Sequence, residues 1–440
     1  MDTKDLGKPG NEKGIGIEIH RLMTELYPLC RSITGDGFRK TMEILQRHVP
    51  LEIREVPTGT RVFDWTVPKE WNIRDAYIKN PKGKKIVDFR KSNLHVVSYS
   101  IPVKMRISLK DLKKHLFTLP AHPDWIPYKT SYYKEDWGFC LSHRQFLALE
   151  KGDYEVVIDS RLEDGFLTYG ELFLPGEKEE EVLISAHACH PSLANDNLSG
   201  VGLATILAKH LGSVGRRFSY RFLFIPGTIG AITWLCLNEE KTKKIKAGLV
   251  VTGVGDRGDI AYKKSRRGNA EIDRVAAHVL EHSGQPYRLL DFHPYGYDER
   301  QYCSPGFNLP VGRLSRTPFG EYPEYHTSAD NMEFVSADSL ADSYEKIRSV
   351  IDMLEGNRIY VSRNQKCEPQ LGKRGLYFSA GANEIVLLWV LNMSDGGNSL
   401  LDIAERSGLP FSAVQEAAQT LAKSGLLAER SEPAAVDRQP

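Results

Sequence analysis

The sequence predicts an α/β fold with a mostly parallel central sheet and flanking helices, extended by a small β-rich insert and a C-terminal winged-helix domain. Three observations carry this prediction. Strand-like and helix-like segments alternate between residues 153 and 355, as in parallel sheets connected by helices. Residues 60–127 are rich in tryptophan, proline and short strand-like segments, and a helix, turn, helix and strand follow Cys367.

Length and charge set the broad class of protein. The 440 residues include 58 Lys and Arg against 57 Asp and Glu, and 41% are hydrophobic, which predicts two to three domains with a large core. The near-zero net charge argues against nucleic-acid binding by bulk electrostatics. Without a signal peptide or an apolar run of roughly 20 residues, we expect a cytoplasmic protein that does not enter membranes. Six cysteines without CxxC spacing indicate reduced thiols.

The N-terminal third predicts helices and then the insert. After a disordered lead over 1–15, apolar residues at helical spacing fill Ile17–His48, with a break at Thr34–Gly37. A short strand over Leu51–Val56 follows, and Leu94–Tyr99 reads as a strand within the insert. The insert carries three tryptophans, Trp65, Trp71 and Trp125. A compact core is favoured over a ligand cage for them, and the cage stays open.

The α/β core is predicted element by element from apolar periodicity. The expected strands are Glu155–Asp159, Phe166–Leu174, Glu181–His187, Tyr220–Ile225 and Leu249–Val254. The expected helices are Asn197–Leu211, Ile229–Leu237, Glu271–Glu281 and Leu340–Leu354. Sheets of this class bind ligands beyond the carboxyl ends of their strands, which is where functional residues are expected.

The C-terminal region predicts a winged helix. A helix over Asn383–Leu391 precedes a capping-box start at Ser399–Asp402, and a second helix ends at Lys423 before a strand over Leu426–Ala428. Residues 372–430 carry five basic and six acidic residues, whereas a DNA reader presents a basic face. We therefore expect a packing or subunit-contact role here. The tail 431–440 is expected to be disordered.

The segment 184–200 places candidate metal ligands together. His187 ends a predicted strand, and Asp196 stands just before a predicted helix, so both donors project from the ends of rigid elements. His190, three residues after His187, is either a further ligand or a supporting group. Hydrogen-bonded loop histidines are the alternative, and the cluster with Asp196 makes it the weaker one.

A second segment, 324–330, contains His326 followed by Thr327 and Asp330. This pattern suggests a ligand held in a tight, capped loop. Asp330 either belongs to that loop or caps the following helix, and both interpretations stay open.

These residues resemble a known family. His187, the Asn-Asp-Asn-x-Ser-Gly run at 195–200 and His-Thr-x-x-Asp at 326–330 are similar to zinc aminopeptidases, which share their fold with glutaminyl cyclases. The chain resembles more closely a bacterial aminopeptidase-like domain family that adds a β insert and a C-terminal winged helix. The matching stretches are Val62–Trp71, Ser131–Tyr133, Trp137–Cys140, Cys189–Asn197, Tyr297–Gly306 and Glu368–Gly372.

The resemblance covers residues 16–430 and implies three domains. These are a zinc-aminopeptidase-like core over 16–59 and 128–360, the β-rich insert over 60–127 and the winged-helix-like domain over 372–430.

It further implies that His187 and His326 each ligate a metal and that Asp196 binds one ion or bridges two. Three protein ligands and a water suffice for one catalytic zinc, so a single zinc ion is expected. Such an ion polarises a carbonyl and lowers the pKa of its water.

Two positions depart from the family pattern. Gly227 stands where the resemblance implies a glutamate, and a glycine can neither bind a metal nor accept a proton. Gly253 stands where a further aspartate ligand is implied, and Asp256 lies three residues on. The sequence therefore predicts a metal site that lacks its expected general base.

Other residues are candidates for the missing roles. Asp298 and Glu299 are the candidate catalytic carboxylates, and Arg300 and Tyr325 are the candidate substrate-binding residues. A bidentate arginine suits a substrate carboxylate, although a surface ion cluster at 298–300 is the open alternative.

The sequence thus favours a metal-dependent, aminopeptidase-like hydrolase. It would cleave an amide or peptide bond of a small aminoacyl or peptide conjugate in a biosynthetic pathway. The alternative, motivated by Gly227, is a catalytically altered relative: a non-hydrolytic acyl-transfer or cyclisation enzyme, or a binding protein. The expected partners are a small peptide or aminoacyl substrate and a second copy of the chain, with no nucleic acid and no membrane.

Overall fold

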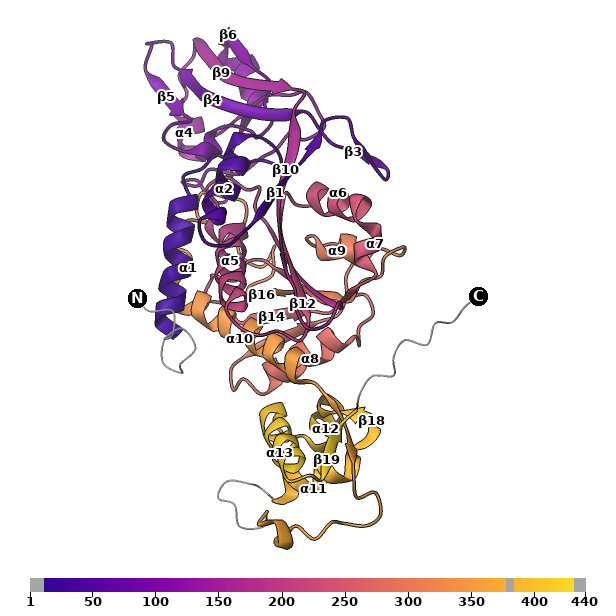
Figure 1. Cartoon of the computed structure of the whole chain (residues 1–440). Coiled ribbons are helices and arrows are strands. Elements are labelled where there is room, and N and C mark those ends of the chain that lie inside the picture. Colours follow the sequence, from indigo (N-terminus) through magenta and orange to yellow (C-terminus); the bar gives the residue numbers. More distant parts are fainter. Residues whose placement is uncertain (1–11, 377–383, 431–440) are drawn as a thin grey trace. The chain divides into compact units, whose positions relative to one another are not determined.

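The computed structural model describes residues 12–376 and 384–430 (Figure 1). Its chain divides into two compact units: Met1–Asp273 with Pro286–Ile347, and Arg274–Gln285 with Arg348–Pro440. The disordered lead was expected over 1–15. Residues 1–11 lie outside the described residues, and the expectation is wrong for residues 12–15, which begin helix α1 (Glu12–Leu26). The expected disorder of 431–440 and the predicted helical start at Asn383 fall outside the described residues as well.

The first unit is built on a large mixed sheet. Its eight strands, in spatial order, are β1 (Glu52–Pro57), β10 (Phe166–Leu174), β12 (Ser219–Ile225), β11 (Glu181–His187), β13 (Ile245–Val251), β16 (Val311–Ser315), β14 (Ile260–Lys263) and β15 (Tyr287–Leu290). Strands β12, β11, β13 and β16 pair in parallel, as do β14 and β15. The pairs β1–β10, β10–β12 and β14–β16 are antiparallel.

The expectation of a mostly parallel sheet is therefore not confirmed, and the sheet is mixed. Residues 175–180, which join β10 to β11, form neither helix nor strand. Parallel strands need a long crossover, so this short connection reverses the chain and makes β10 antiparallel to the parallel centre of the sheet.

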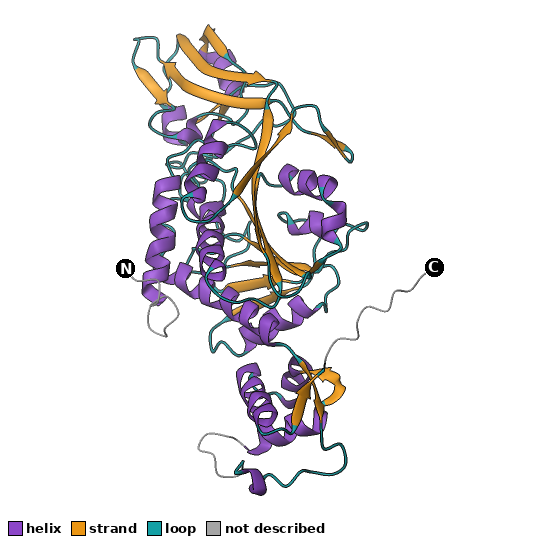
Figure 2. Ribbon diagram, viewed as in Figure 1, coloured by secondary structure: helices purple, strands orange, loops and turns teal. Residues whose placement is uncertain are grey.

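Helices cover both faces of this sheet. In Figure 1, α1 (Glu12–Leu26), α2 (Asp36–Gln46) and α5 (Gly200–Gly212) lie on one side, and α6 (Ile229–Leu237), α7 (Glu239–Thr242) and α9 (Glu299–Tyr302) on the other. Strands β11 and β12 are buried along their whole length between them, so the core of the first unit sits here. Figure 2 shows the same layers by secondary structure.

Most predicted core elements are confirmed. Strands β10 and β11 and helices α6 and α8 (Glu271–Glu281) match their predicted bounds, and α10 (Ala337–Gly356) contains its predicted span. The helix expected from Asn197 begins at Gly200, because Asp196 and Asn197 have non-helical backbone angles within the turn Ala194–Ser199. The strand expected over Leu249–Val254 is β13, which starts and ends earlier.

The β-rich insert contains a second, antiparallel sheet in the order β5-β4-β9-β6. Its strands are β4 (Glu70–Lys79), β5 (Lys85–Asp88), β6 (Val103–Ser108) and β9 (Asp153–Glu163). Strand β9 lies beyond residue 127 and continues into β10, so this sheet draws on chain outside the predicted insert. Smaller elements are β2 (Arg61–Val62), β3 (Trp65–Thr66), β7 (Leu116–Phe117), β8 (Phe139–Cys140), α3 (Leu109–Leu112) and α4 (His143–Leu147).

The strand expected over Leu94–Tyr99 is wrong. The chain there forms a short 3-10 turn, which the Ser92 side chain caps, and then isolated bridges at Val96 and Ser98. The apolar residues are buried by packing in an irregular segment, and not on a sheet face.

The second unit contains a three-stranded sheet in the order β18-β17-β19, formed by β18 (Asp395–Ser399), β17 (Ile359–Ser362) and β19 (Leu427–Glu429). Its helices are α11 (Glu384–Met393), α12 (Leu400–Ser407) and α13 (Phe411–Lys423). The predicted capping box is confirmed, because Ser399 and Asp402 cap α12 reciprocally. Across the described residues, helices long and apolar enough to cross a membrane are absent.

Candidate metal centre and pocket

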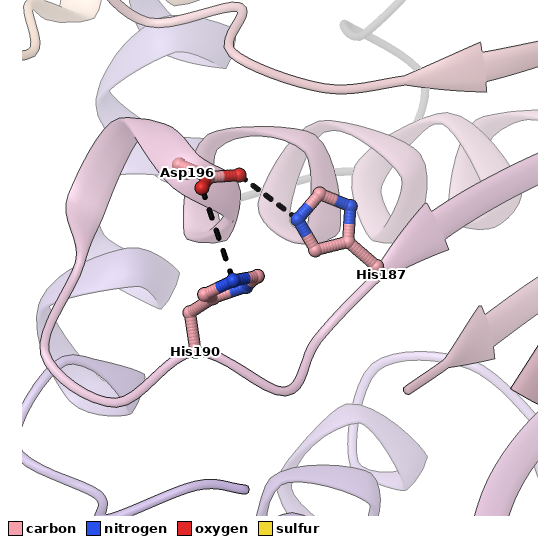
Figure 3. Close-up of side chains that lie close together, drawn as sticks. All are labelled: His187, His190 and Asp196. Atoms are coloured by element: carbon pink, nitrogen blue, oxygen red, sulfur yellow. Dashed lines mark hydrogen bonds and ion pairs between the residues drawn. The ribbon is translucent and has the colours of Figure 1, made fainter. Parts of the chain in front are cut away.

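His187, His190 and Asp196 converge at the carboxyl end of β11. Nε2 of His187 lies 2.9 Å from Oδ1 of Asp196, and Nε2 of His190 lies 3.9 Å from Oδ2 of the same carboxylate (Figure 3). His326 reaches this carboxylate from a distant part of the chain, with its Nε2 3.0 Å from Oδ2. The structure thus brings together the three predicted ligands and His190.

The chemistry of this cluster fits a divalent metal ion. One donor atom each from His187, His190 and Asp196 lies within 4.8 Å of the others. Oδ2 of Asp196 and Nε2 of His326 are buried and make no hydrogen bond of ordinary geometry. Buried polar atoms are normally paired, and imidazole with carboxylate is a donor set that zinc prefers. A cation between these atoms would satisfy both.

The protonation states of His190 and Asp196 agree with this interpretation, whereas Asp196 raises the pKa of His187 against the effect of burial. Burial lowers the pKa of His190 to about 3, so its imidazole is neutral at neutral pH. Burial opposes the ionisation of Asp196, yet the surrounding histidines hold its pKa well below the usual range. Neutral imidazole and ionised carboxylate are the forms that bind metals.

A layer of hydrogen bonds fixes the ligand loop. The Asp330 carboxylate accepts the backbone N–H groups of Asn195 and Asp196, at 2.6 and 3.0 Å. Asp330 therefore holds the loop that carries a predicted ligand. The alternative that it caps the following helix is wrong, because α10 starts only at Ala337.

Asp256 also serves this loop. Its Oδ2 accepts from the Asn195 side chain at 2.9 Å, and its Oδ1 accepts from the Thr317 hydroxyl at 2.6 Å. The carboxylate is thus occupied by neighbours and does not belong to the His187, His190 and Asp196 cluster. It does not replace the ligand that Gly253 lacks.

Sequence reasoning missed Arg31, a fully buried residue behind the site. Its Nε donates to the His190 carbonyl at 3.0 Å. Burial lowers the pKa of its guanidinium to about 10, and no carboxylate pairs with it among the described residues. A single arginine within a predicted helical stretch carries no signal of this role, because the contact joins residues 159 positions apart.

A pocket of about 280 Å³ opens beside the candidate metal ligands. Its lining includes the three clustered histidines and three of the predicted site residues, Asp298, Arg300 and Tyr325. The fourth, Glu299, is not part of the lining: it is buried and pairs with Lys263 at 2.9 Å. Glu299 therefore supports the structure beneath the pocket, and its predicted catalytic role has no geometric support.

Asp298 is fully buried and faces the place that Gly227 leaves open. A Cβ atom at position 227 would lie 3.1 Å from Cβ of His187 and 3.5 Å from Oδ2 of Asp298. Neither carboxylate oxygen of Asp298 has a hydrogen-bond partner. Burial raises the pKa of Asp298 to about 7, against the opposing influence of His187. The chain therefore carries a carboxylate beside its candidate metal ligands despite the glycine.

Comparison with known proteins places the chain in a family. Residues 20–357 match the family described as a domain of unknown function, DUF4910, and residues 358–429 match a winged helix-turn-helix. The chain belongs to the DUF4910 family. The resemblance to an aminopeptidase-like family with a C-terminal winged helix is thereby confirmed.

Relatives of this DUF4910 chain carry informative names. A Clostridium acetobutylicum protein, provisionally named for polysaccharide biosynthesis with an aminopeptidase-like domain, is 56% identical over 423 residues, covering 95% of this chain and 97% of its own. A crystal structure from the same species, provisionally described as a peptidase, is 55% identical with a TM-score of 0.93, and the match covers 96% of this chain and 98% of that chain.

More distant structures share the fold of the DUF4910 core. A zinc aminopeptidase from Bacillus subtilis has a TM-score of 0.58 at 12% identity, covering 79% of this chain and 95% of that chain. A peptidase M28 precursor from Shewanella amazonensis has a TM-score of 0.54 at 13% identity, covering 78% and 96%. These similarities show an aminopeptidase-like fold with a C-terminal winged helix.

Proposed function

We propose that this chain is a metal-dependent hydrolase that cleaves an amide bond in a small aminoacyl or peptide conjugate. His187, Asp196 and His326 would hold one zinc ion, with His190 as a fourth donor within reach. One observation carries the proposal: buried donor atoms of Asp196, His326 and Asp298 that lack hydrogen-bond partners surround or line a single pocket. The aminopeptidase-like relatives support it.

A bound zinc ion supplies Lewis acidity for the substrate carbonyl. Asp298 is the proposed general base: its unpartnered carboxylate faces His187 and takes a proton from the attacking water at Oδ1 or Oδ2. Proton transfer by a positioned side chain contributes on the order of 10²–10⁴ in rate. Asp298 would thus do what the glutamate at position 227 does in the family pattern.

Arg300 and Tyr325 are the proposed substrate-binding residues. Nε of Arg300 is buried without a hydrogen bond, and its guanidinium lines the pocket, where it can bind a substrate carboxylate. The ring of Tyr325 stacks on His326 at 4.0 Å between centroids, which fixes the orientation of that ligand. A pocket of about 280 Å³ suits a small conjugate better than a folded protein.

The first experiment measures zinc content. Wild-type protein purified without chelator is expected to contain about one equivalent of zinc, and Asp196→Asn and His326→Ala well below half an equivalent. His48→Ala is the matched control, since His48 lies at the end of α2 outside the pocket lining. Equal zinc content in all four proteins would remove the proposed ligand set.

The second experiment separates hydrolysis from the alternative of a catalytically altered relative. Aminoacyl anilides and short acyl-amino acids are offered to the wild type, Asp298→Asn and Gly227→Glu. We expect wild-type turnover, a loss of about 10²–10⁴ in Asp298→Asn, and no gain in Gly227→Glu, whose side chain would crowd Asp298. Hydrolysis by Gly227→Glu alone would favour the alternative.

A further inference from the structure

Two exposed aromatic residues form part of the pocket wall. Trp65, on β3 of the insert, is 47% exposed, and Tyr133 is 53% exposed. Their ring centroids lie 5.5 Å apart with planes tilted by 59°, and both side chains line the pocket that holds the metal ligands. Trp71 of the same insert is 3% exposed and stacks on Tyr99 in the core. Of these two tryptophans, Trp71 packs in the core and Trp65 does not.

The backbone beside these rings adopts unfavourable conformations. Tyr133 has φ 62° and Phe63, in the two-residue turn between β2 and β3, has φ 55°. Bulky residues rarely occupy the left-handed region, and turns of this kind favour asparagine and glycine. Residues in such conformations persist where the surrounding structure holds them, often at ligand-binding segments.

Packing at the tip of the hairpin keeps Trp65 in place. The Phe63 ring meets Phe307 edge-on, with centroids 5.9 Å apart. This contact ties the tip of the β2–β3 hairpin to the chain that follows α9, so the hairpin does not rely on its own short strands. The exposed faces of Trp65 and Tyr133 are therefore held ready beside the pocket, with no described side chain covering them.

We propose that Trp65 and Tyr133 form a stacking subsite for a ring in the substrate, next to the scissile amide. The inference rests on the proposed function, because it takes the pocket as the substrate site. Aromatic rings favour flat, apolar faces, and a pyranose and a phenyl ring both present such a face. Arg300, the proposed carboxylate-binding residue, lines the same pocket, so the substrate class is an amide conjugate with a ring on one side and a charged group.

The test measures binding and needs no turnover. Zinc-treated Asp298→Asn protein is titrated in ligand-observed NMR with three probes: the methyl glycoside of N-acetylglucosamine, N-acetylphenylalanine methylamide and the ringless N-acetylalanine methylamide. We expect at least one ring-bearing probe to bind about tenfold more tightly than the ringless one. The stronger ring probe tells whether a sugar or an aromatic ring is the source.

Variants made in the same background locate the subsite. Trp65→Ala and Tyr133→Ala are expected to reduce ring-probe affinity about tenfold, to the level of the ringless probe, while Trp65→Phe retains most of it. Phe166→Ala is the matched control, because Phe166 is 41% exposed on β10 and does not line the pocket. Equal affinity for all three probes, or unchanged ring binding in Trp65→Ala, would overturn the inference.

The proposed function and the stacking subsite can be refuted independently of each other. If the protein takes up no zinc yet binds a ring probe through Trp65, the metal chemistry is refuted and the stacking subsite is supported. If zinc binds at His187, Asp196 and His326 and Trp65→Ala leaves ring binding unchanged, the metal site is supported and the stacking subsite is refuted. Thermal unfolding of each variant, compared with Trp65→Phe, shows whether a loss of binding reflects misfolding.

Discussion

The pocket of the first unit and the helical core of the second unit differ in whether their buried polar groups have hydrogen-bond partners. Around the pocket, buried atoms of Asp196, Asp298, Arg300 and His326 have no hydrogen-bond partner. Among the described residues of the second unit, Oγ of Ser394 is the one buried polar side-chain atom without a hydrogen-bond partner. Unpaired buried polar atoms are costly. The first unit also has them elsewhere, at Thr233, Thr252 and Ser315, and a ligand in the pocket would pair those that lie around it.

In the second unit, charged and polar groups pair with one another. Arg274 bonds both Asp402 and Glu405, at 2.6 Å for the former, and the N–H of Phe411 donates to Nε2 of His278 at 3.1 Å. Fully satisfied networks of this kind rigidify and specify a packing arrangement. These pairs stabilise the packing of the second unit.

The largest expected effect is stabilisation of the first unit alone by zinc. At a thousandfold excess over its Kd, a ligand that binds only the folded state stabilises it by about 4 kcal/mol. Hydrogen exchange should therefore slow in β11 and β12, while α13 and β19 exchange as before. Asp196→Asn should abolish the effect. Equal slowing in both units would mean that the metal site does not lie where the unpaired atoms are.

The next prediction compares two buried acids of the first unit in metal-free protein. Asp298→Asn removes a buried charge without partners and should raise the free energy of unfolding by about 1–3 kcal/mol. Asp330→Asn weakens acceptance of two backbone N–H groups and should lower it by a similar amount. Chemical denaturation at pH 8 measures both. A destabilised Asp298→Asn would show that this carboxylate is structural.

The stability of the second unit is expected to depend on pH. Burial and neighbouring His282 lower the pKa of His278 to about 4, so the folded state binds this proton less readily than the unfolded state, whose pKa is about 6.5. The resulting contribution to the free energy of unfolding is complete above pH 6.5 and is lost as the pH falls towards 4, by about 3 kcal/mol at most.

Hydrogen exchange of α13 as a function of pH checks this prediction. His278→Gln keeps an acceptor for the Phe411 N–H and has no charge to gain, so its exchange should vary less between pH 6.5 and 4. A steeper dependence in the variant than in the wild type would contradict the assignment.

Much of the candidate metal centre could be predicted from the sequence for a physical reason. His187 ends a strand whose bounds the apolar pattern predicted, and Asp196 lies in the turn that precedes α5. Asp298 and Arg300 came from family resemblance, and both line the pocket. Local pattern could not have found Arg31, because its role depends on a contact between segments distant in the chain.

Tertiary contacts also determine which tryptophan of the insert lies in the pocket wall and which lies in the core. Trp65 and Trp71 lie six positions apart in similar surroundings, so sequence alone could not separate a pocket wall from a core residue. The mixed sheet is different: the six residues at 175–180 between β10 and β11 are too few for a parallel crossover. The bounds of the predicted strands, Phe166–Leu174 and Glu181–His187, already show that this connection is short.

The smallest expected effect concerns DNA. Helix α13, the second helix of the winged helix-turn-helix, carries one acid, Glu416, and one base, Lys423, so it offers little charge to phosphates. We expect duplex DNA to bind no more tightly than non-specific binders, with a Kd of about 10⁻⁴ M or weaker at physiological salt. Fluorescence anisotropy measures this, with Lys423→Glu as the charge-reversed comparison. Submicromolar binding that Lys423→Glu weakens would break the contrast drawn above, because the second unit would then carry a ligand surface of its own.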